Sequence, residues 1–189
     1  NDRGRTAAAT GKRVHPLLRD DKVAELLEDE GQRRITREYT EEAVKFIEAS
    51  AKAEKNFFLY LPHTAMHVPL YPHPDFAGKS KNGVYGDWVE EVDWSVGQVL
   101  ETLKKLKLGE NTLVLFTTEF GRTPFAQSGS DKVGPGRDHN KYGFSCWLAG
   151  GGGKAGFSFG QTDEIGWKTV ENPVHWHDFH ATVLHLMGV

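Results

Sequence analysis

The chain is poor in cysteine, lacks a long apolar run and carries no strong excess of charge of either sign. Cys146 is the single cysteine among 189 residues, which excludes an internal disulfide and a zinc cluster built on several cysteines. No apolar run approaches the roughly 20 residues of a membrane-spanning helix, so we expect no membrane partner. The 23 basic residues are interspersed with 26 acidic ones, for a net charge of -3, which argues against a nucleic-acid partner.

The rest of the composition is that of a globular protein. Hydrophobic residues make up 38% and charged residues 26% of the chain, and its length suits one domain, residues 1–189. The chain starts at Asn1 rather than at methionine, so we expect a start that was processed, trimmed or never captured. A targeting signal removed in that way would leave no trace, and the compartment therefore cannot be read from these residues.

Apolar spacing predicts four helices. From Asp87 to Lys107 apolar residues recur every three or four positions, which gives one long stripe along a helix. Shorter helices are predicted over residues 20–30, where Gly31 ends the pattern, over residues 40–51 after Thr40, and over residues 178–187.

Continuous apolar runs predict three strands, at residues 57–61, 113–116 and 144–148, the last followed by a glycine turn at residues 150–153. The first two strands flank the long helix, which is the order of a parallel crossover unit. The predicted fold class is therefore α/β.

Two loops follow the first two predicted strands, where ligands bind in open parallel sheets. Residues 62–69 carry two histidines, and residues 117–123 carry Glu119 and Arg122. Imidazoles can donate to an oxyanion, the Glu119 carboxylate can hold a divalent cation, and Arg122 can neutralise a charged oxygen. The alternative is a loop ion pair between Glu119 and Arg122, with the histidines packed beside prolines.

A third cluster, residues 136–140, places Asp138 beside His139 before the third predicted strand. A carboxylate next to an imidazole suits a metal ion, although Asp, Asn and Gly also favour a solvated turn. Histidines crowd the last predicted helix as well. There we rank capping and surface roles above a zinc site, because no His-Glu-x-x-His motif is present.

Two common catalytic motifs are missing from the glycine-rich and serine-containing stretches. Residues 148–155 can be compared with a phosphate-binding loop. Leu148 stands where that loop has its first glycine, and Ala155, which follows Lys154, stands where it has Ser or Thr. The serines lie in no Gly-x-Ser-x-Gly elbow, so a Ser-His-Asp hydrolase has no support.

Three longer phrases stand out in the first part of the chain: Tyr39-Thr-Glu-Glu-Ala-Val-Lys-Phe-Ile, Phe57-Phe-Leu-Tyr-Leu-Pro-His-Thr-Ala-Met-His-Val-Pro-Leu and Tyr85-Gly-Asp-Trp-Val-Glu-Glu-Val-Asp-Trp-Ser-Val-Gly-Gln-Val-Leu. Through these phrases, residues 20–116 resemble arylsulfatases of the alkaline phosphatase superfamily. The resemblance implies a three-layer sandwich with a mostly parallel sheet, of which this chain would lack the N-terminal part. It also implies a periplasmic or extracellular setting.

The resemblance also implies site residues. His67, in the His-x-Pro phrase, matches the sulfatase histidine that hydrogen-bonds the sulfate group, and Arg122 is a second candidate for binding substrate. Glu119, Asp138 and His139 are candidates for binding a divalent metal, calcium by resemblance. A sulfatase would read Ser-Asp-Asn-Gly where this chain reads Thr118-Glu-Phe-Gly, so Glu119 can replace the aspartate but Phe120 cannot ligate through its side chain.

Two further departures from the sulfatase pattern stand out. The motif Cys-x-Pro-x-Arg, whose cysteine becomes formylglycine, is absent from the printed sequence, so no catalytic nucleophile is assigned. Residues 117–189 instead resemble an uncharacterised bacterial family of alkaline-phosphatase-like proteins, through Glu119-Phe-Gly-Arg-Thr-Pro, Gly136-Arg-Asp-His and Trp147-Leu-Ala-Gly-Gly-Gly. We expect a junction between two related segments at residues 116–117.

Two functions follow as hypotheses. The first is a metal-dependent sulfuric ester hydrolase acting on a small sulfated substrate, with a phosphorylated ester as the nearest alternative. The second is a noncatalytic or degenerate domain that folds without turning over an ester. An upstream Cys-x-Pro-x-Arg motif would favour the first hypothesis, and a native start at Asn1 would favour the second.

Overall fold

The computed structural model describes residues 5–6, 13–128 and 133–189 of the chain. Backbone contacts divide it into two compact units, Asn1–Leu106 and Lys107–Val189, which are described separately below. Among the described residues, no helix combines the length and the apolar character that crossing a membrane requires. The expectation of a single domain stays a prediction.

The first unit begins with an antiparallel sheet of β1 (Arg5–Thr6), β2 (Arg13–Arg19) and β3 (Lys22–Leu27). The helix predicted over residues 20–30 is therefore wrong. Arg19 pairs with Lys22 across a two-residue turn, and Asp20 takes the positive φ of 55° that such a hairpin turn needs. A single turn of helix, α1 (Asp29–Gln32), follows and contains Gly31 instead of ending at it.

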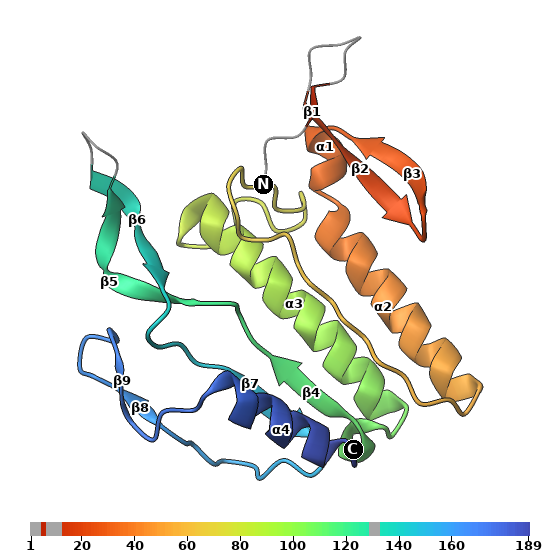
Figure 1. The fold of residues 1–189 in the computed structure, drawn as a ribbon. Helices are drawn as coiled ribbons and strands as arrows, with labels where there is room; N and C mark the ends of the chain where they lie inside the picture. The colour runs from red at the N-terminus through yellow and green to blue at the C-terminus, as the bar shows by residue number, and fades with distance from the viewer. Residues whose placement is uncertain (1–4, 7–12, 129–132) are drawn as a thin grey trace. The chain divides into compact units, whose positions relative to one another are not determined.

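Two long helices, α2 (Ile35–Lys52) and α3 (Gly83–Lys105), lie side by side in the first unit (Figure 1). They run in the same direction, since Trp88 Nε1 donates to Thr36 Oγ1 at 3.2 Å and Thr40 Oγ1 lies 2.6 Å from Ser95 Oγ farther along both. The apolar core between and beside them consists of Leu27, Ile35, Ala43, Ile47, Trp88, Val92 and Leu103.

The long helix predicted over residues 87–107 is confirmed, and it begins four residues earlier than expected. The predicted second helix also exists, but it starts at Ile35 and not after Thr40. Thr40 is no N-cap. Its side chain is buried, and its hydroxyl donates to the carbonyl of Thr36 one turn back, at 2.6 Å.

Residues 57–61 return along the two helices as an extended segment, and the strand predicted there is not formed (Figure 1). Phe57 packs against Phe46 of α2, with ring centroids 5.9 Å apart. Phe58 and Tyr60 point the other way and are 79% and 76% exposed. The continuous apolar run predicted a strand buried on both faces, whereas only alternate side chains are partly buried. A strand also needs a backbone partner, and no partner strand lies beside these residues in the described part of the chain.

In the second unit a short 3-10 helix, η1 (Gly109–Asn111), leads into β4 (Leu113–Phe116), which is the predicted second strand. β4 pairs antiparallel with β7 (Trp147–Gly150), and the Phe116 and Trp147 rings stack at 5.5 Å across the pair. The third predicted strand thus exists but starts at Trp147. The mostly parallel sheet is not found among the described residues, whose sheets are all antiparallel.

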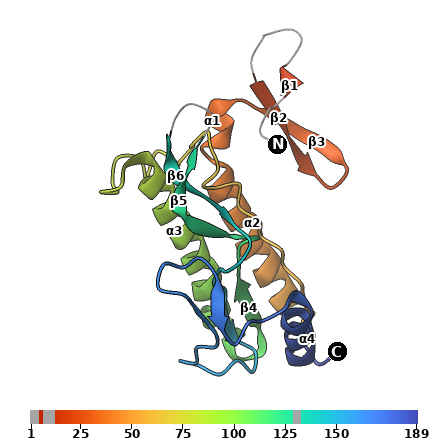
Figure 2. The ribbon, with the colours of Figure 1, turned by 60° about the vertical axis from the view of Figure 1, so that its left-hand side comes forward.

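The remaining strands of the second unit form two hairpins. β5 (Gly121–Ser128) pairs with β6 (Val133–Asn140), and β8 (Gln161–Thr162) pairs with β9 (Thr169–Glu171) (Figure 2). Much of the two segments predicted as loops, residues 117–123 and 136–140, therefore lies in strands. The chain ends in α4 (Trp176–Leu186), which confirms the predicted last helix.

Candidate functional site

His67 lies in the connection between the extended segment and α3, on an exposed stretch rich in histidine and proline. Its backbone N–H donates to the carbonyl of Thr64 at 3.4 Å, and its ring Nδ1 lies 2.8 Å from the carbonyl of Val68. A carbonyl can only accept, so the proton of the neutral ring is assigned to Nδ1. In the imidazolium form Nε2 is also a donor, as recognition of an oxyanion requires.

The loop that carries His67 is attached at both ends to α3. Nε2 of His63 lies 3.2 Å from Ser95 Oγ, and the backbone N–H of His73 donates to Glu91 Oε2 at 2.8 Å. Glu91 and Ser95 are four residues apart, so both anchors lie on one face of the helix, a single turn apart. Residues 63–73 are therefore a closed loop of the Ω type, with His67 near its middle.

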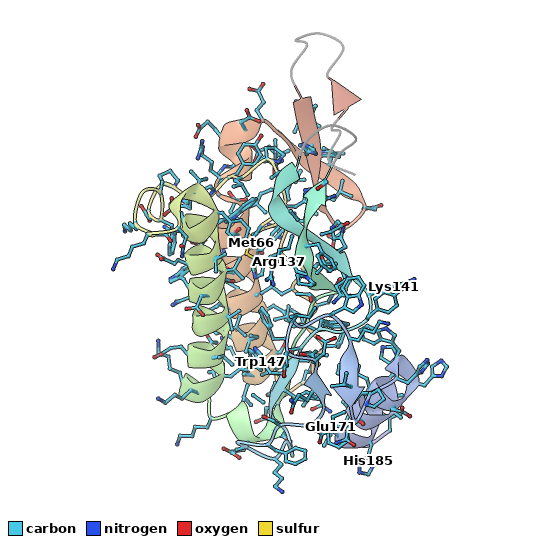
Figure 3. All side chains as sticks on the ribbon, turned by 90° about the vertical axis from the view of Figure 1, so that its left-hand side faces the viewer. Met66, Arg137, Lys141, Trp147, Glu171 and His185 are labelled. Atoms are coloured by element: carbon cyan, nitrogen blue, oxygen red, sulfur yellow. The ribbon has the colours of Figure 1, made fainter. Side chains whose placement is uncertain are left out.

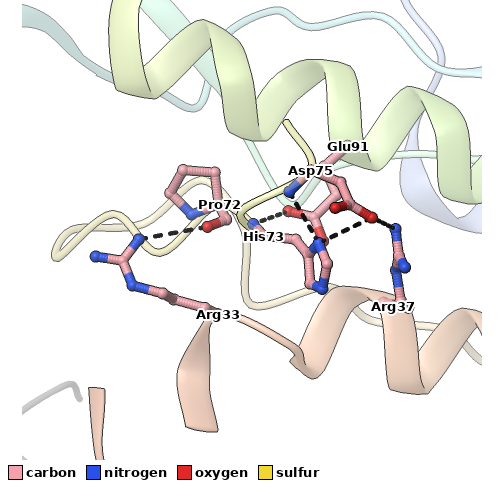
Figure 4. A network of polar contacts seen from close by, with 6 residues as sticks. All are labelled: Arg33, Arg37, Pro72, His73, Asp75 and Glu91. Carbon is pink, nitrogen blue, oxygen red and sulfur yellow. Dashed lines mark hydrogen bonds and ion pairs between the residues drawn. The ribbon is translucent and has the colours of Figure 1, made fainter. Parts of the chain in front are cut away.

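The exit of this loop is also bound to α2 (Figure 4). Arg33 donates to the carbonyl of Pro72 at 3.4 Å, and Arg37 Nη2 donates to Asp75 Oδ2 at 2.6 Å. The N–H of Asp75 donates to Nδ1 of His73 at 3.1 Å. Arg33 at the C-cap of α1, Arg37 of α2 and Glu91 of α3 thus fix the same short segment.

Burial shifts the pKa values of Glu91 and His63, one group from each anchor of the loop. Glu91 is fully buried, and desolvation raises the pKa of its carboxyl, while the His73 N–H bond opposes that shift. Burial lowers the pKa of His63, so its imidazole is held neutral. A neutral, half-buried His63 suits an anchor better than an anion ligand.

Farther along the same connection, Asp87 holds the turn that precedes α3. Its carboxylate accepts three backbone N–H bonds, from Ser80 at 2.8 Å, Gly78 at 2.8 Å and Lys79 at 3.1 Å. These bonds, that from Ser80 foremost, lower the pKa of Asp87. Asp87, Glu91 and Ser95 therefore form one buried polar row, spaced by four residues, that holds residues 63–80 in place.

In the second unit, β5 and β6 bring predicted site residues together. Arg122 and His139 are direct partners across the hairpin, and Arg122 donates to the carbonyl of Arg137 at 3.1 Å. The ring centroid of Phe120 lies 4.3 Å from that of His139 and 5.4 Å from the guanidinium carbon of Arg122. A guanidinium beside an imidazole is a donor pair suited to an oxyanion.

The predicted metal ligands are arranged less favourably. Asp138 Oδ1 accepts the backbone N–H of His139 at 2.7 Å and lies 3.4 Å from its ring Nδ1. Glu119 is exposed, and it makes no ion pair with Arg122 within the described ranges. Those ranges contain no group of three or more His, Cys, Asp or Glu side chains able to hold a metal ion. In the described part of the chain, the candidate ligands Glu119, Asp138 and His139 are therefore not assembled into a site for a divalent metal such as calcium.

The histidines near the C-terminus serve α4 itself. His175 is the N-cap, because its ring Nδ1 accepts the backbone N–H of His177 at 3.2 Å. Asp178 completes a capping box by accepting the N–H of His175 at 3.4 Å. The prediction that these histidines serve in capping rather than in a zinc site is confirmed for His175.

Residues 73–189 match the sequence model of a family described as "Protein of unknown function (DUF1501)". This match spans well over half of the chain. The chain belongs to the DUF1501 family. The predicted second segment, residues 117–189, lies inside the match, but the match starts within the sulfatase-like segment, so a junction at residue 117 stays a prediction.

Sulfatases are the curated relatives of this DUF1501 chain. It is 47% identical over 87 residues to human steryl-sulfatase, covering 46% of this chain and 15% of the relative. It is 36% identical over 105 residues to an N-acetylgalactosamine-6-O-sulfatase of Bacteroides thetaiotaomicron, covering 56% and 18%. About half of the chain is thus homologous to sulfatases, while the chain spans less than a fifth of these relatives' length.

A solved structure supports the same relationship at the level of the fold. The PsFucS1 sulfatase from Pseudoalteromonas superposes with a TM-score of 0.63 over 89% of this chain and 33% of its own, at 24% identity. The DUF1501 chain therefore shares a sulfatase-like α/β fold, although its own described sheets are all antiparallel.

Sequence reasoning missed the polar row on α3. The helix was recognised from its apolar stripe, and Asp87, Glu91 and Ser95 were not considered as site residues. Their signal was nevertheless present: three polar residues spaced by four, each beside an apolar position of a helix that must bury one face. Which backbone groups they bind depends on the loop conformation, which spacing alone does not give.

Proposed function

We propose that this DUF1501 chain is part of a sulfuric ester hydrolase in which His67 binds the sulfate group of a small sulfated substrate. The observation that carries the proposal is the closed loop of residues 63–73, which is anchored on buried polar groups and carries His67 on an exposed stretch. The homology of about half the chain to sulfatases supports the same reading.

The chemistry proposed for His67 is binding and orientation. With Nδ1 bonded to the Val68 carbonyl, a protonated ring directs its second donor, Nε2–H, at a sulfate oxygen. Charge-assisted bonds to a tetrahedral oxyanion are strong, and a donor fixed in advance loses little entropy on binding. Arg122 and His139 are proposed as a second donor pair for an anionic oxygen.

Hydrolysis itself breaks the ester bond to sulfur and adds water, releasing an alcohol, sulfate and a proton. No nucleophile for this step is assigned to a residue of this chain, and the metal proposed from the resemblance is given no role. The second candidate is a domain that binds the anion without turnover, and the exposed carboxylate of Glu119 favours it over a complete metal-dependent centre. A periplasmic or extracellular setting remains part of the proposal.

The proposal is tested by binding and turnover of 4-nitrophenyl sulfate and 4-nitrophenyl phosphate. We expect the sulfate ester to bind more tightly than the phosphate ester, and His67→Ala to weaken its binding about tenfold through loss of one charged hydrogen bond. His185→Ala, an exposed histidine in the last turn of α4, is the control and should bind as wild type does. Turnover would support the hydrolase, and binding alone would support the noncatalytic domain. Equal binding by wild type and His67→Ala would refute the role of His67.

A further inference from the structure

Three aromatic rings gather on the second unit. Phe125 comes from β5, Tyr142 follows β6, and Trp167 lies in the turn between β8 and β9. The centroid of Trp167 lies 5.4 Å from that of Phe125 and 5.6 Å from that of Tyr142. Phe125 remains 59% exposed and Tyr142 49% exposed, so the cluster presents ring surface to the solvent.

The cluster is held together by a buried side chain. Asn140 is 1% exposed, and its Nδ2 donates to the carbonyls of Trp167 at 3.0 Å and Gly166 at 3.2 Å. Its Oδ1 accepts the backbone N–H of Tyr142 at 3.0 Å. The N–H of Thr169 donates to the carbonyl of Tyr142 at 3.2 Å, which ties the two segments together a second time. The rings are therefore positioned before any ligand arrives.

The turn that carries Trp167 is fixed independently by Asp163. The Asp163 carboxylate accepts the backbone N–H of Trp167 at 2.7 Å and that of Lys168 at 3.1 Å. Its backbone N–H donates to the carbonyl of Lys168 at 2.9 Å. This carboxylate therefore serves the backbone, and within the described residues it forms no ion pair with the Lys168 ammonium group.

Two positive charges converge on one ring of the cluster. The ammonium nitrogens of Lys141 and Lys168 lie 5.2 Å and 5.8 Å from the Tyr142 ring centroid. Of these residues, Lys141 is labelled in Figure 3. Neither ammonium is paired with a carboxylate in the part of the chain that the structure describes, and Glu164 of the same turn is exposed. Two ammonium groups beside one ring give this part of the chain a local positive charge that favours an anionic ligand.

We infer that this cluster, here called the Tyr142 platform (Phe125, Lys141, Tyr142, Trp167 and Lys168), is a binding site for a sulfated oligosaccharide. Exposed aromatic rings offer a rigid apolar surface for the C–H face of a sugar ring, and the two ammonium groups match a sulfate substituent. The choice of ligand class rests on the proposed function, because a chain that binds a sulfate ester would gain affinity from a second subsite on a sulfated glycan.

The inference is tested by calorimetric titration of the full chain with a sulfated dextran oligosaccharide. The unsulfated dextran of the same length, inorganic sulfate and a single-stranded oligonucleotide are titrated in parallel. We expect the sulfated sugar to bind most tightly, because it alone combines the sugar face with the sulfate. An oligonucleotide that binds as tightly would overturn the inference, since the site would then recognise polyanions in general.

Variants separate the two parts of the platform. We expect Lys141→Gln and Lys168→Gln each to weaken binding of the sulfated sugar about fivefold, and Phe125→Ala to weaken both sugars. The control is the exposed pair Lys154 and Phe157, whose ammonium nitrogen and ring centroid are 5.0 Å apart; the Phe157 ring also stacks with Phe159 at 6.2 Å, but in the described residues no second ammonium group lies beside it. Lys154→Gln should change nothing.

The outcomes also separate this inference from the proposed function. The Tyr142 platform should bind the sulfated sugar in His67→Ala as well, because it shares no residue with the His67 loop. Loss of 4-nitrophenyl sulfate binding in His67→Ala with retained sugar binding supports both proposals. An unchanged affinity in Lys141→Gln, Lys168→Gln and Phe125→Ala, or an equal loss in Lys154→Gln, overturns the platform whatever His67 does.

Discussion

The imidazole of His63 donates a hydrogen bond from Nε2 to Ser95 Oγ, 3.2 Å away, and the surrounding donors determine this direction. The hydroxyl proton of Thr40 goes to the Thr36 carbonyl at 2.6 Å, so Ser95 donates to Thr40 at 2.6 Å and must accept from His63. Nδ1 of His63 is then an unprotonated nitrogen, buried with no partner among the described residues. Adding a proton there is unfavourable, which agrees with the lowered pKa of His63.

Removing Ser95 Oγ, which accepts the hydrogen bond of His63, should loosen the His67 loop. In Ser95→Ala the His63 N–H loses its partner in a buried place, at a cost of about 1–3 kcal/mol in the free energy of unfolding. We expect faster amide hydrogen exchange at residues 63–67 than the global loss of stability explains. Asp93→Ala, an exposed position on the same helix, is the control. Uniform changes across the whole first unit would count against a local anchor.

Glu91 should make the stability of the protein depend on pH. Burial raises its pKa above the ordinary value of 4.5, so near that pH the native state holds the proton more tightly than the unfolded chain does. The free energy of unfolding should therefore fall as the pH rises from 4.5 through the raised pKa. We expect Glu91→Gln to remove this part of the dependence, while the exposed Glu90→Gln keeps it, as measured by urea unfolding at several pH values.

Asp87 should make the free energy of unfolding depend on pH in the opposite direction to Glu91. Its pKa is held below the ordinary value of 3.8, so it contributes stability above that value and loses it as the pH falls through the lowered pKa. Asp87→Asn keeps the size of the side chain but weakens the three N–H bonds of residues 78–80. Amide exchange of Gly78, Lys79 and Ser80 should be faster in the variant at neutral pH. Unchanged protection of these amides would show that the carboxylate does not hold the turn.

Two glycines of the β5–β6 hairpin should respond differently to alanine. A Cβ at Gly121 would meet the carbonyl oxygen of Gly143 at 2.3 Å, whereas a Cβ at Gly136 would meet nothing within 4 Å. Gly121→Ala should therefore cost about 1–3 kcal/mol and displace the neighbouring Arg122, with Gly136→Ala near neutral. Thermal unfolding of both variants checks this. Similar losses in both would mean that the close approach at Gly121 is relieved by movement.

Local patterns predicted the helices better than the sheets. α3 was found because its apolar residues recur at helical spacing over many turns, which few other structures produce. Residues 20–30 were read as a helix because the turn at Asp20, which makes them one arm of a hairpin, was not weighed. The segment 57–61 has the alternation of a strand, but pairing is a long-range property that no local pattern contains.

The sequence also predicted only a part of the candidate site. His67, Arg122 and His139 could be named from the sequence, and the hairpin register then placed Arg122 directly opposite His139. The metal site could not be judged from residue types, because ligation depends on three or more side chains converging on one point. The anchors Glu91 and Ser95 escaped notice because their partners are 18 and 32 residues distant in the chain.

The central claim is that His67 binds the sulfate group, and ring nitrogen NMR of the full chain during a titration with inorganic sulfate tests it most directly. We predict that the Nε2 signal of His67 shifts saturably with sulfate, while the signal of His185 at the end of α4 stays in place and chloride at equal ionic strength has no effect. A His67 signal that does not move, or that moves equally with chloride, would contradict the account.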